Sequence, residues 1–143
     1  PADLRRYLDQ QYAEGQGHKM AVFITSFGFK HGLPKEVDVV FDMRFLRNPH
    51  YVPELKPQTG LDEGVRAYIQ EDENFDKAFE QIKTFLATHL PLYEKSGKSY
   101  MTIAFGCTGG QHRSVFLADS MATALKDLPF DIQVLHRDKP VSA

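Results

Sequence analysis

The chain has 143 residues, of which 42% are hydrophobic and 25% charged, and its formal net charge is −2. This length and composition predict one globular domain with its own core, and the charge excludes a surface that attracts nucleic acid uniformly. A single cysteine excludes an internal disulfide, and no apolar run is long enough to span a membrane, so we expect a cytoplasmic protein that does not insert into membranes.

The first predicted element is an amphipathic helix over residues 2–13, followed by a glycine-containing break. The chain starts at Pro1 rather than at Met, which suggests a piece of a longer protein. We therefore expect residues 1–17 to form a linker from an upstream domain and residues 18–143 to form the domain itself. An ordinary first helix of the same domain is an equally good interpretation.

Two strands are predicted next. Residues 20–27 are apolar on both faces, as in a central strand of a covered sheet, and Lys30 follows in a glycine-containing loop. Residues 37–45 form the second strand, in which Asp42 and Arg44 leave the same face. These two side chains are either a structural ion pair or two halves of a polar site. The irregular loop 47–60 places His50 after an Asn-Pro turn.

Helices are predicted from residue 60 to about 69 and from about 75 to 93, with Pro91 expected to kink or end the second one. Strands are predicted over residues 99–105 and 131–136, and a helix over 115–125. This order of elements predicts an α/β fold with a mostly parallel sheet and helices on both faces.

The stretch from Gly106 to Ser114 joins the third strand to its helix. Its adjacent glycines allow backbone amides to turn inward, and the helix that follows offers unpaired N–H groups and the positive end of its dipole. Arg113 adds a planar cation that can bind two oxygens. These features together predict a cradle for an anion, most naturally a phosphate.

The same stretch matches C-x-x-G-x-x-R-[ST], which resembles the phosphate loop of cysteine-dependent phosphatases. That resemblance implies a Cys107 thiolate as nucleophile, Arg113 as phosphate ligand and Ser114 as the hydroxyl that helps the thiolate leave. A general acid would also be needed, with Asp42 or Asp62 as candidates. Gly106 stands where that family usually has His. A metal site is not indicated, because the six His and one Cys show no ligand spacing.

Four longer motifs resemble the C-terminal domain of the RapZ family: SFGFKHGLP at 26–34, FDMRFLRNPHY at 41–51, LKPQTGLD at 55–62 and GCTGGQHRSV at 106–115. The resemblance spans roughly residues 20–135. It implies a fold similar to part of phosphofructokinase and an upstream P-loop domain that would be needed for ATP or GTP binding or hydrolysis. It also implies that the protein senses glucosamine-6-phosphate, binds small RNA, presents it to an endoribonuclease and forms homo-oligomers.

By this match, no cofactor and no catalytic residue are expected in the domain. The residues expected to bind the phosphorylated amino sugar are Asp42, Arg44, His50, Cys107, Thr108, Gly109, Gly110, His112, Arg113 and Ser114. Those expected to face RNA are Lys30, Arg137 and Lys139. The tail 137–143 is short and weakly basic, whereas the family's RNA-binding members end in a basic cluster. We therefore predict a non-catalytic regulatory domain, with a cysteine phosphatase as the alternative.

Overall fold

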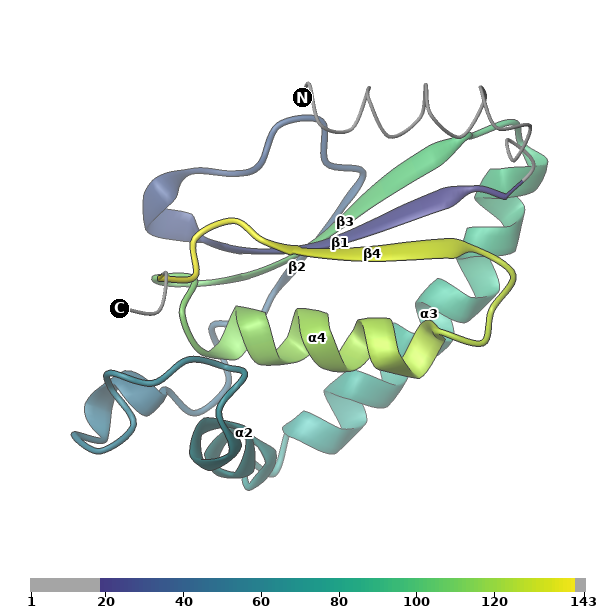
Figure 1. Ribbon diagram of the computed structural model, residues 1–143. Helices are drawn as coiled ribbons and strands as arrows, with labels where there is room; N and C mark the ends of the chain where they lie inside the picture. The colour runs from purple at the N-terminus through teal and green to yellow at the C-terminus, as the bar shows by residue number, and fades with distance from the viewer. Residues whose placement is uncertain (1–18, 141–143) are drawn as a thin grey trace.

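Four parallel strands form the centre of the protein in the computed structural model, which describes residues 19–140 (Figure 1). The strands are β1 (Ala21–Gly28), β2 (Val39–Asp42), β3 (Tyr100–Cys107) and β4 (Asp131–His136), in the spatial order β2-β3-β1-β4. The helix expected over 2–13 lies outside the described residues. Among those described, no helix combines the length and apolar composition that crossing a bilayer requires.

There are three α-helices among the described residues: α2 (Glu63–Gln70), α3 (Phe75–Lys95) and α4 (Arg113–Leu125). Helix α4 packs directly on β1, β3 and β4, α3 packs on α4, and α2 contacts α3. Two short 3-10 turns, η1 (Phe29–His31) and η2 (Pro49–Tyr51), follow β1 and β2. The prediction of an α/β fold with a parallel sheet is confirmed, whereas the expected helices on both faces are found on one face only within the described residues. In Figure 1 the three α-helices lie on one side of the sheet, and the loop between β1 and β2 crosses the other side.

The main core lies between the sheet and the helices. Alternate residues of β1 and β3, such as Ile24 and Ile103, point to this side and are fully buried together with Leu90 of α3. Phe75 of α3 stacks on Phe116 of α4 with 5.3 Å between ring centroids, which ties the two helices together. Burying each such large apolar side chain contributes about 1.5–3 kcal/mol to folding.

The ends of the second strand and of the long helix differ from the prediction for physical reasons that the structure shows. The second strand ends at Asp42 rather than at residue 45, because the chain turns there: Leu46 N–H bonds back to the Met43 carbonyl at 3.3 Å. Helix α3 continues past Pro91 to Lys95, so the proline does not end it. Pro91 is exposed, whereas the neighbouring Leu90 is fully buried, so packing of this last turn offsets the lost backbone hydrogen bond.

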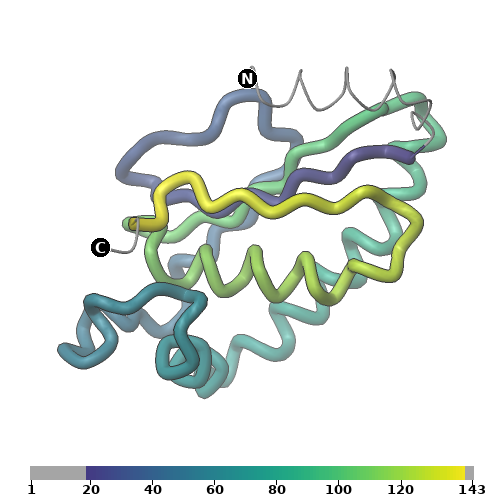
Figure 2. The backbone as a smooth tube through the Cα atoms, in the orientation of Figure 1, coloured from purple at the N-terminus to yellow at the C-terminus, as the bar shows by residue number. Residues whose placement is uncertain are grey.

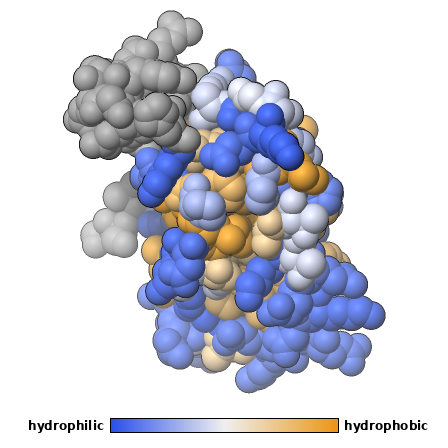
Figure 3. Space-filling model, turned by 90° about the vertical axis from the view of Figure 1, so that its right-hand side faces the viewer, coloured by the Kyte–Doolittle hydropathy of each residue, from blue (hydrophilic) through white to orange (hydrophobic). Residues whose placement is uncertain are grey.

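The parallel arrangement brings the carboxyl ends of all four strands to one edge of the sheet. The tube in Figure 2 shows both the loop after β1 and the long excursion after β2 leaving from this edge. Figure 3 shows the opposite end, where hydrophilic residues surround exposed hydrophobic ones. Asp38 and Lys98, which lie just before β2 and β3, form an ion pair with 3.0 Å between Lys98 Nζ and Asp38 Oδ1. In open α/β sheets ligands bind at the carboxyl edge, so the candidate site is sought there.

Candidate anion-binding site

A five-residue loop, 108–112, joins the end of β3 to the start of α4, as the sequence predicted. Its turn depends on Gly110, whose φ of +80° is a conformation that residues with a Cβ rarely adopt. Thr108 is exposed and Gly109 partly exposed, so the loop is open to solvent at its tip. We call the loop together with the first turn of α4, residues 108–115, the anion loop.

The backbone amides of the anion loop have no acceptor within the described residues. From Thr108 to Val115, none donates a hydrogen bond to any acceptor among residues 19–140. The Phe116 N–H is the first that does, to the His112 carbonyl at 3.0 Å. The first turn of any helix leaves such donors unpaired, and here no side chain caps them. Eight consecutive donors at the positive end of a helix dipole can stabilise an anion.

Arg113 is buried, with 4% of its surface exposed. Its Nη1 donates to the carbonyls of Arg44 at 2.7 Å and Leu46 at 3.1 Å, and its Nη2 donates to Thr108 Oγ1 at 3.4 Å. The guanidinium therefore links the turn after β2 to the anion loop by hydrogen bonds to both. Its Nε is buried and has no partner within the described residues, which is unusual for a charged donor. That nitrogen is a donor without an acceptor within the described residues, and it is shielded from solvent.

Cys107 is the last residue of β3, and its side chain is 3% exposed. The Sγ donates to Ser114 Oγ at 3.2 Å, so its neighbour is a neutral hydroxyl rather than a base. Both candidate general acids are engaged: Asp42 binds Arg44, and Asp62 Oδ2 accepts the Thr59 N–H at 2.8 Å. These contacts do not favour the phosphatase alternative, which needs an accessible thiolate and a free acid.

Asp42 and Arg44 form an ion pair just beyond the end of β2. Arg44 Nη2 lies 2.7 Å from Asp42 Oδ2, and both side chains are about half exposed. The hydrogen bonds from Arg44 lower the pKa of the Asp42 carboxyl below its ordinary value, and the charge of Arg113 adds to this effect. Of the two interpretations left open by the sequence, the structure contains the ion pair, and the role of these residues toward a ligand stays a prediction.

The two predicted site histidines differ in their surroundings. His112 is 5% exposed, and its Nε2 lies 3.2 Å from the Lys56 carbonyl, a contact that a neutral imidazole makes by donating. Burial lowers the pKa of His112. Gln111 Nε2 also donates to the Lys56 carbonyl, at 2.8 Å, so this pair anchors the loop that follows β2. His50 is exposed and places its ring edge-on to the ring of Tyr51.

Two site residues were missed by sequence reasoning. A Cβ on Gly28 would lie 2.4 Å from Gly109 C and 2.7 Å from Gly110 N, so the end of β1 touches the anion loop backbone to backbone. Asp138 accepts the Gly28 N–H at 2.8 Å and thereby fixes that contact from the tail. The glycine that ends an apolar strand was a usable signal for Gly28. Asp138 gave none, because its partner lies 110 residues away.

The three residues expected to face RNA differ in their exposure and in their contacts. Lys30 is exposed, its N–H donates to the Thr108 carbonyl at 3.2 Å, and its Cε lies 4.0 Å from the position of a Cβ on Gly109. Arg137 is occupied, because its Nη2 contacts Asp138 Oδ2 at 2.7 Å and the Gly32 carbonyl at 2.6 Å. Lys139 is partly buried. Lys30 thus lies beside the anion loop itself.

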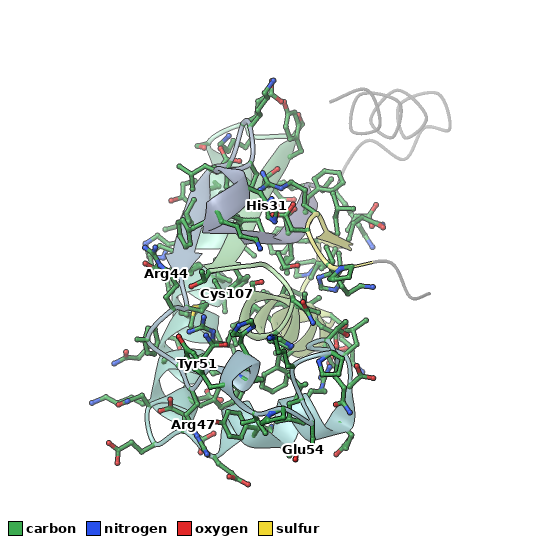
Figure 4. The ribbon with its side chains drawn as sticks, turned by 90° about the vertical axis from the view of Figure 1, so that its left-hand side faces the viewer. His31, Arg44, Arg47, Tyr51, Glu54 and Cys107 are labelled. Atoms are coloured by element: carbon green, nitrogen blue, oxygen red, sulfur yellow. The ribbon has the colours of Figure 1, made fainter. Side chains whose placement is uncertain are left out.

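Figure 4 looks onto the carboxyl edge of the sheet. In that view Cys107 is central, Arg44 is near it, His31 is on one side and Tyr51 on the other, so the end of β3 and the loops after β1 and β2 meet at this edge. Within the part of the chain that the structure describes, no group of three or more His, Cys, Asp or Glu side chains could hold a metal ion.

Residues 20–140 match the protein family described as the RapZ C-terminal domain. Among curated relatives, a nucleotide-binding protein of Rhodospirillum rubrum is 47% identical over 138 residues, covering 96% of this chain and 43% of the relative. One from Novosphingobium aromaticivorans is 48% identical over 136 residues, covering 95% and 45%. One from Limosilactobacillus fermentum is 43% identical over 138 residues, covering 96% and 48%. The chain spans less than half the length of these relatives.

Proposed function

We propose that this chain, which belongs to the family of RapZ C-terminal domains, is a non-catalytic regulatory domain that senses a phosphorylated amino sugar. The observation that carries this proposal is the run of eight backbone N–H groups, residues 108–115, without an acceptor among the described residues. Together with the unpartnered Nε of Arg113, these donors suit a phosphate dianion, whose oxygens need several donors at once.

The remainder of the ligand would be recognised around this loop. Lys30 is exposed beside Gly109 and supplies a cation that can approach the phosphate from the solvent side. An ammonium group on the sugar needs a carboxylate, and Asp42 at the end of the neighbouring strand provides it. His50 is exposed and can bind a sugar hydroxyl. No step of covalent chemistry is assigned to Cys107, because its thiol is buried against a neutral hydroxyl.

RNA binding is the second part of the proposed function. We assign it to Lys30 first, because this lysine is exposed whereas Arg137 already binds Asp138 and the Gly32 carbonyl. Lys139 would add a further phosphate contact. The domain would present small RNA to an endoribonuclease in the cytoplasm, as a homo-oligomer. The nucleotide binding named for the relatives would then reside in the part of those proteins that this chain does not match.

Isothermal titration with glucosamine-6-phosphate tests the sugar proposal. The wild-type chain should bind it, and Lys30→Ala should bind about 3- to 30-fold more weakly, because one charge-assisted contact to the phosphate is lost. Lys126→Ala, which removes an exposed lysine just after α4, is the matched control and should bind like the wild type. The absence of heat at millimolar ligand would refute the proposal.

A gel-shift titration with small RNA at fixed salt tests the second part. Lys30→Ala should weaken RNA binding and reduce its salt dependence by about one phosphate contact, whereas Lys126→Ala should not. Equal RNA affinity for the two variants would remove Lys30 from the proposed interface.

A further inference from the structure

Both oxygens of the Asp42 carboxylate are bound by one residue, Arg44. Arg44 donates to Oδ1 from its backbone N at 3.0 Å and from Nε at 2.9 Å, and to Oδ2 from Nε at 3.1 Å and from Nη2 at 2.7 Å. A carboxylate offers about four lone-pair sites in total. The single Nε hydrogen is shared between the two oxygens, so three N–H groups of Arg44 engage both oxygens of the carboxylate. The ammonium group that the proposed function assigns to Asp42 therefore has to compete with the Arg44 guanidinium.

The Arg44 side chain is held weakly enough to move. It is about half exposed, and within the described residues its guanidinium makes hydrogen bonds only to Asp42. Its other contact is the face of the Phe29 ring, 4.0 Å from the guanidinium carbon. Exposed ion pairs of this kind contribute little to stability because water competes for both partners.

The Arg44 backbone, in contrast, is fixed. Its carbonyl accepts a hydrogen bond from Arg113 Nη1 at 2.7 Å, and the preceding Met43 N–H bonds to the Gly106 carbonyl at 2.8 Å. The side chain can therefore leave Asp42 while the carboxylate and the anion loop keep their relative positions. Asp42 pairs in register with Gly106 of β3, the strand that leads into the anion loop, so the carboxylate and the anion loop lie at the same edge of the sheet.

We infer that the Arg44 guanidinium occupies the place of the ligand's ammonium group and is displaced by it. This inference rests on the proposed function and adds a source of specificity. A phosphorylated sugar with a cationic amine replaces one cation on Asp42 with another, so the carboxylate stays paired and the half-exposed Arg44 guanidinium is left to water. A phosphorylated sugar with only hydroxyl groups offers no such replacement and binds with the Asp42–Arg44 pair closed.

The direction in which Arg44→Ala changes ligand affinity distinguishes this inference from a role in which Arg44 contacts the ligand directly. If Arg44 competes with the ligand, Arg44→Ala leaves Asp42 open and tightens binding of an amino sugar phosphate. If Arg44 itself contacts the ligand, the same substitution weakens binding. The backbone N–H at position 44 remains in the variant and continues to orient the carboxylate.

The experiment is calorimetric titration of the wild type, Arg44→Ala and Arg47→Ala with glucosamine-6-phosphate, glucose-6-phosphate and inorganic phosphate. Arg47 is the matched control, since it is also partly exposed, contacts Glu71 Oε2 at 3.0 Å and lies 3.9 Å from the Tyr68 ring centroid. We expect Arg44→Ala to bind glucosamine-6-phosphate about 3- to 10-fold more tightly than the wild type, without tighter binding of glucose-6-phosphate. Arg47→Ala should resemble the wild type with all three ligands.

Weaker or unchanged binding of glucosamine-6-phosphate by Arg44→Ala overturns the inference and leaves the proposed function intact. An equal gain for both sugar phosphates also overturns it, because the amine would then play no part. A wild type that binds inorganic phosphate but neither sugar phosphate refutes the proposed function instead, and the inference with it.

Discussion

Replacing Gly28 with alanine tests whether the anion loop depends on the close approach of β1. The added Cβ would meet Gly109 C at 2.4 Å, Gly109 O at 2.5 Å and Gly110 N at 2.7 Å, where ordinary contacts begin at 3.4 Å. The overlap is about 1 Å, and all three atoms belong to the backbone, so no side chain can rotate to relieve it. Overpacking of this kind typically costs about 1–3 kcal/mol.

The assay is urea unfolding of Gly28→Ala beside Gly109→Ala. The nearest atom to a Cβ on Gly109 is Lys30 Cε at 4.0 Å, so this control adds the same methyl group to the same contact without a clash. We expect Gly28→Ala to lose about 1–3 kcal/mol of the free energy of unfolding and Gly109→Ala to lose less than about 1 kcal/mol. Gly28→Ala should also bind phosphate more weakly. Equal stability of the two variants would show that the backbones do not meet as described.

Three further predictions concern individual side chains. Aryl-phosphate turnover should be absent in the wild type and unchanged in Cys107→Ser, because the thiol is 3% exposed; turnover that Cys107→Ser abolishes would establish a phosphatase. Burial lowers the pKa of His112, so as pH falls the unfolded chain takes up the proton before the folded protein does. The folded protein should therefore lose stability below about pH 6.5. In thermal unfolding, His112→Gln should lose less stability than the wild type between about pH 7 and pH 5, and an equal loss would contradict this. Burial alone would raise the pKa of Asp138, but hydrogen bonds from Arg137 and the Gly28 N–H keep it below 3.8, so this group stabilises the fold above about pH 4. Asp138→Asn should therefore lower the unfolding temperature more at pH 7 than at pH 3, and the same decrease at both would rule out the charge as its cause.

The elements that sequence reasoning predicted well are those whose signals are local. The last strand was predicted at 131–136, which are its bounds in the structure. Helix α3 was expected from Phe75 because its apolar residues recur at helical spacing over many turns. The turn at 106–114 follows from adjacent glycines between a strand and a helix, and Gly110 has the positive φ that such a turn requires.

The features that sequence reasoning missed depend on contacts between distant segments. The second strand is shorter than predicted because its polar end turns back on itself, although its residues favour β structure. The guanidinium of Arg113 was expected to bind two oxygens of an anion. Instead, its Nη1 donates to the carbonyls of Arg44 and Leu46, about 70 residues earlier in the chain. Only its Nε is left without a partner within the described residues. Which atoms of a guanidinium are free cannot be derived from its position in a motif.

The most direct test of the account is an amide NMR titration of this chain with glucosamine-6-phosphate. The central claim is that the eight free N–H groups of residues 108–115, with Arg113 Nε, hold the phosphate. We predict that these amide resonances and the Arg113 Nε–H resonance shift the most, that they saturate together, and that inorganic phosphate shifts the same set. Saturable binding that leaves these resonances in place and shifts amides elsewhere would contradict the account.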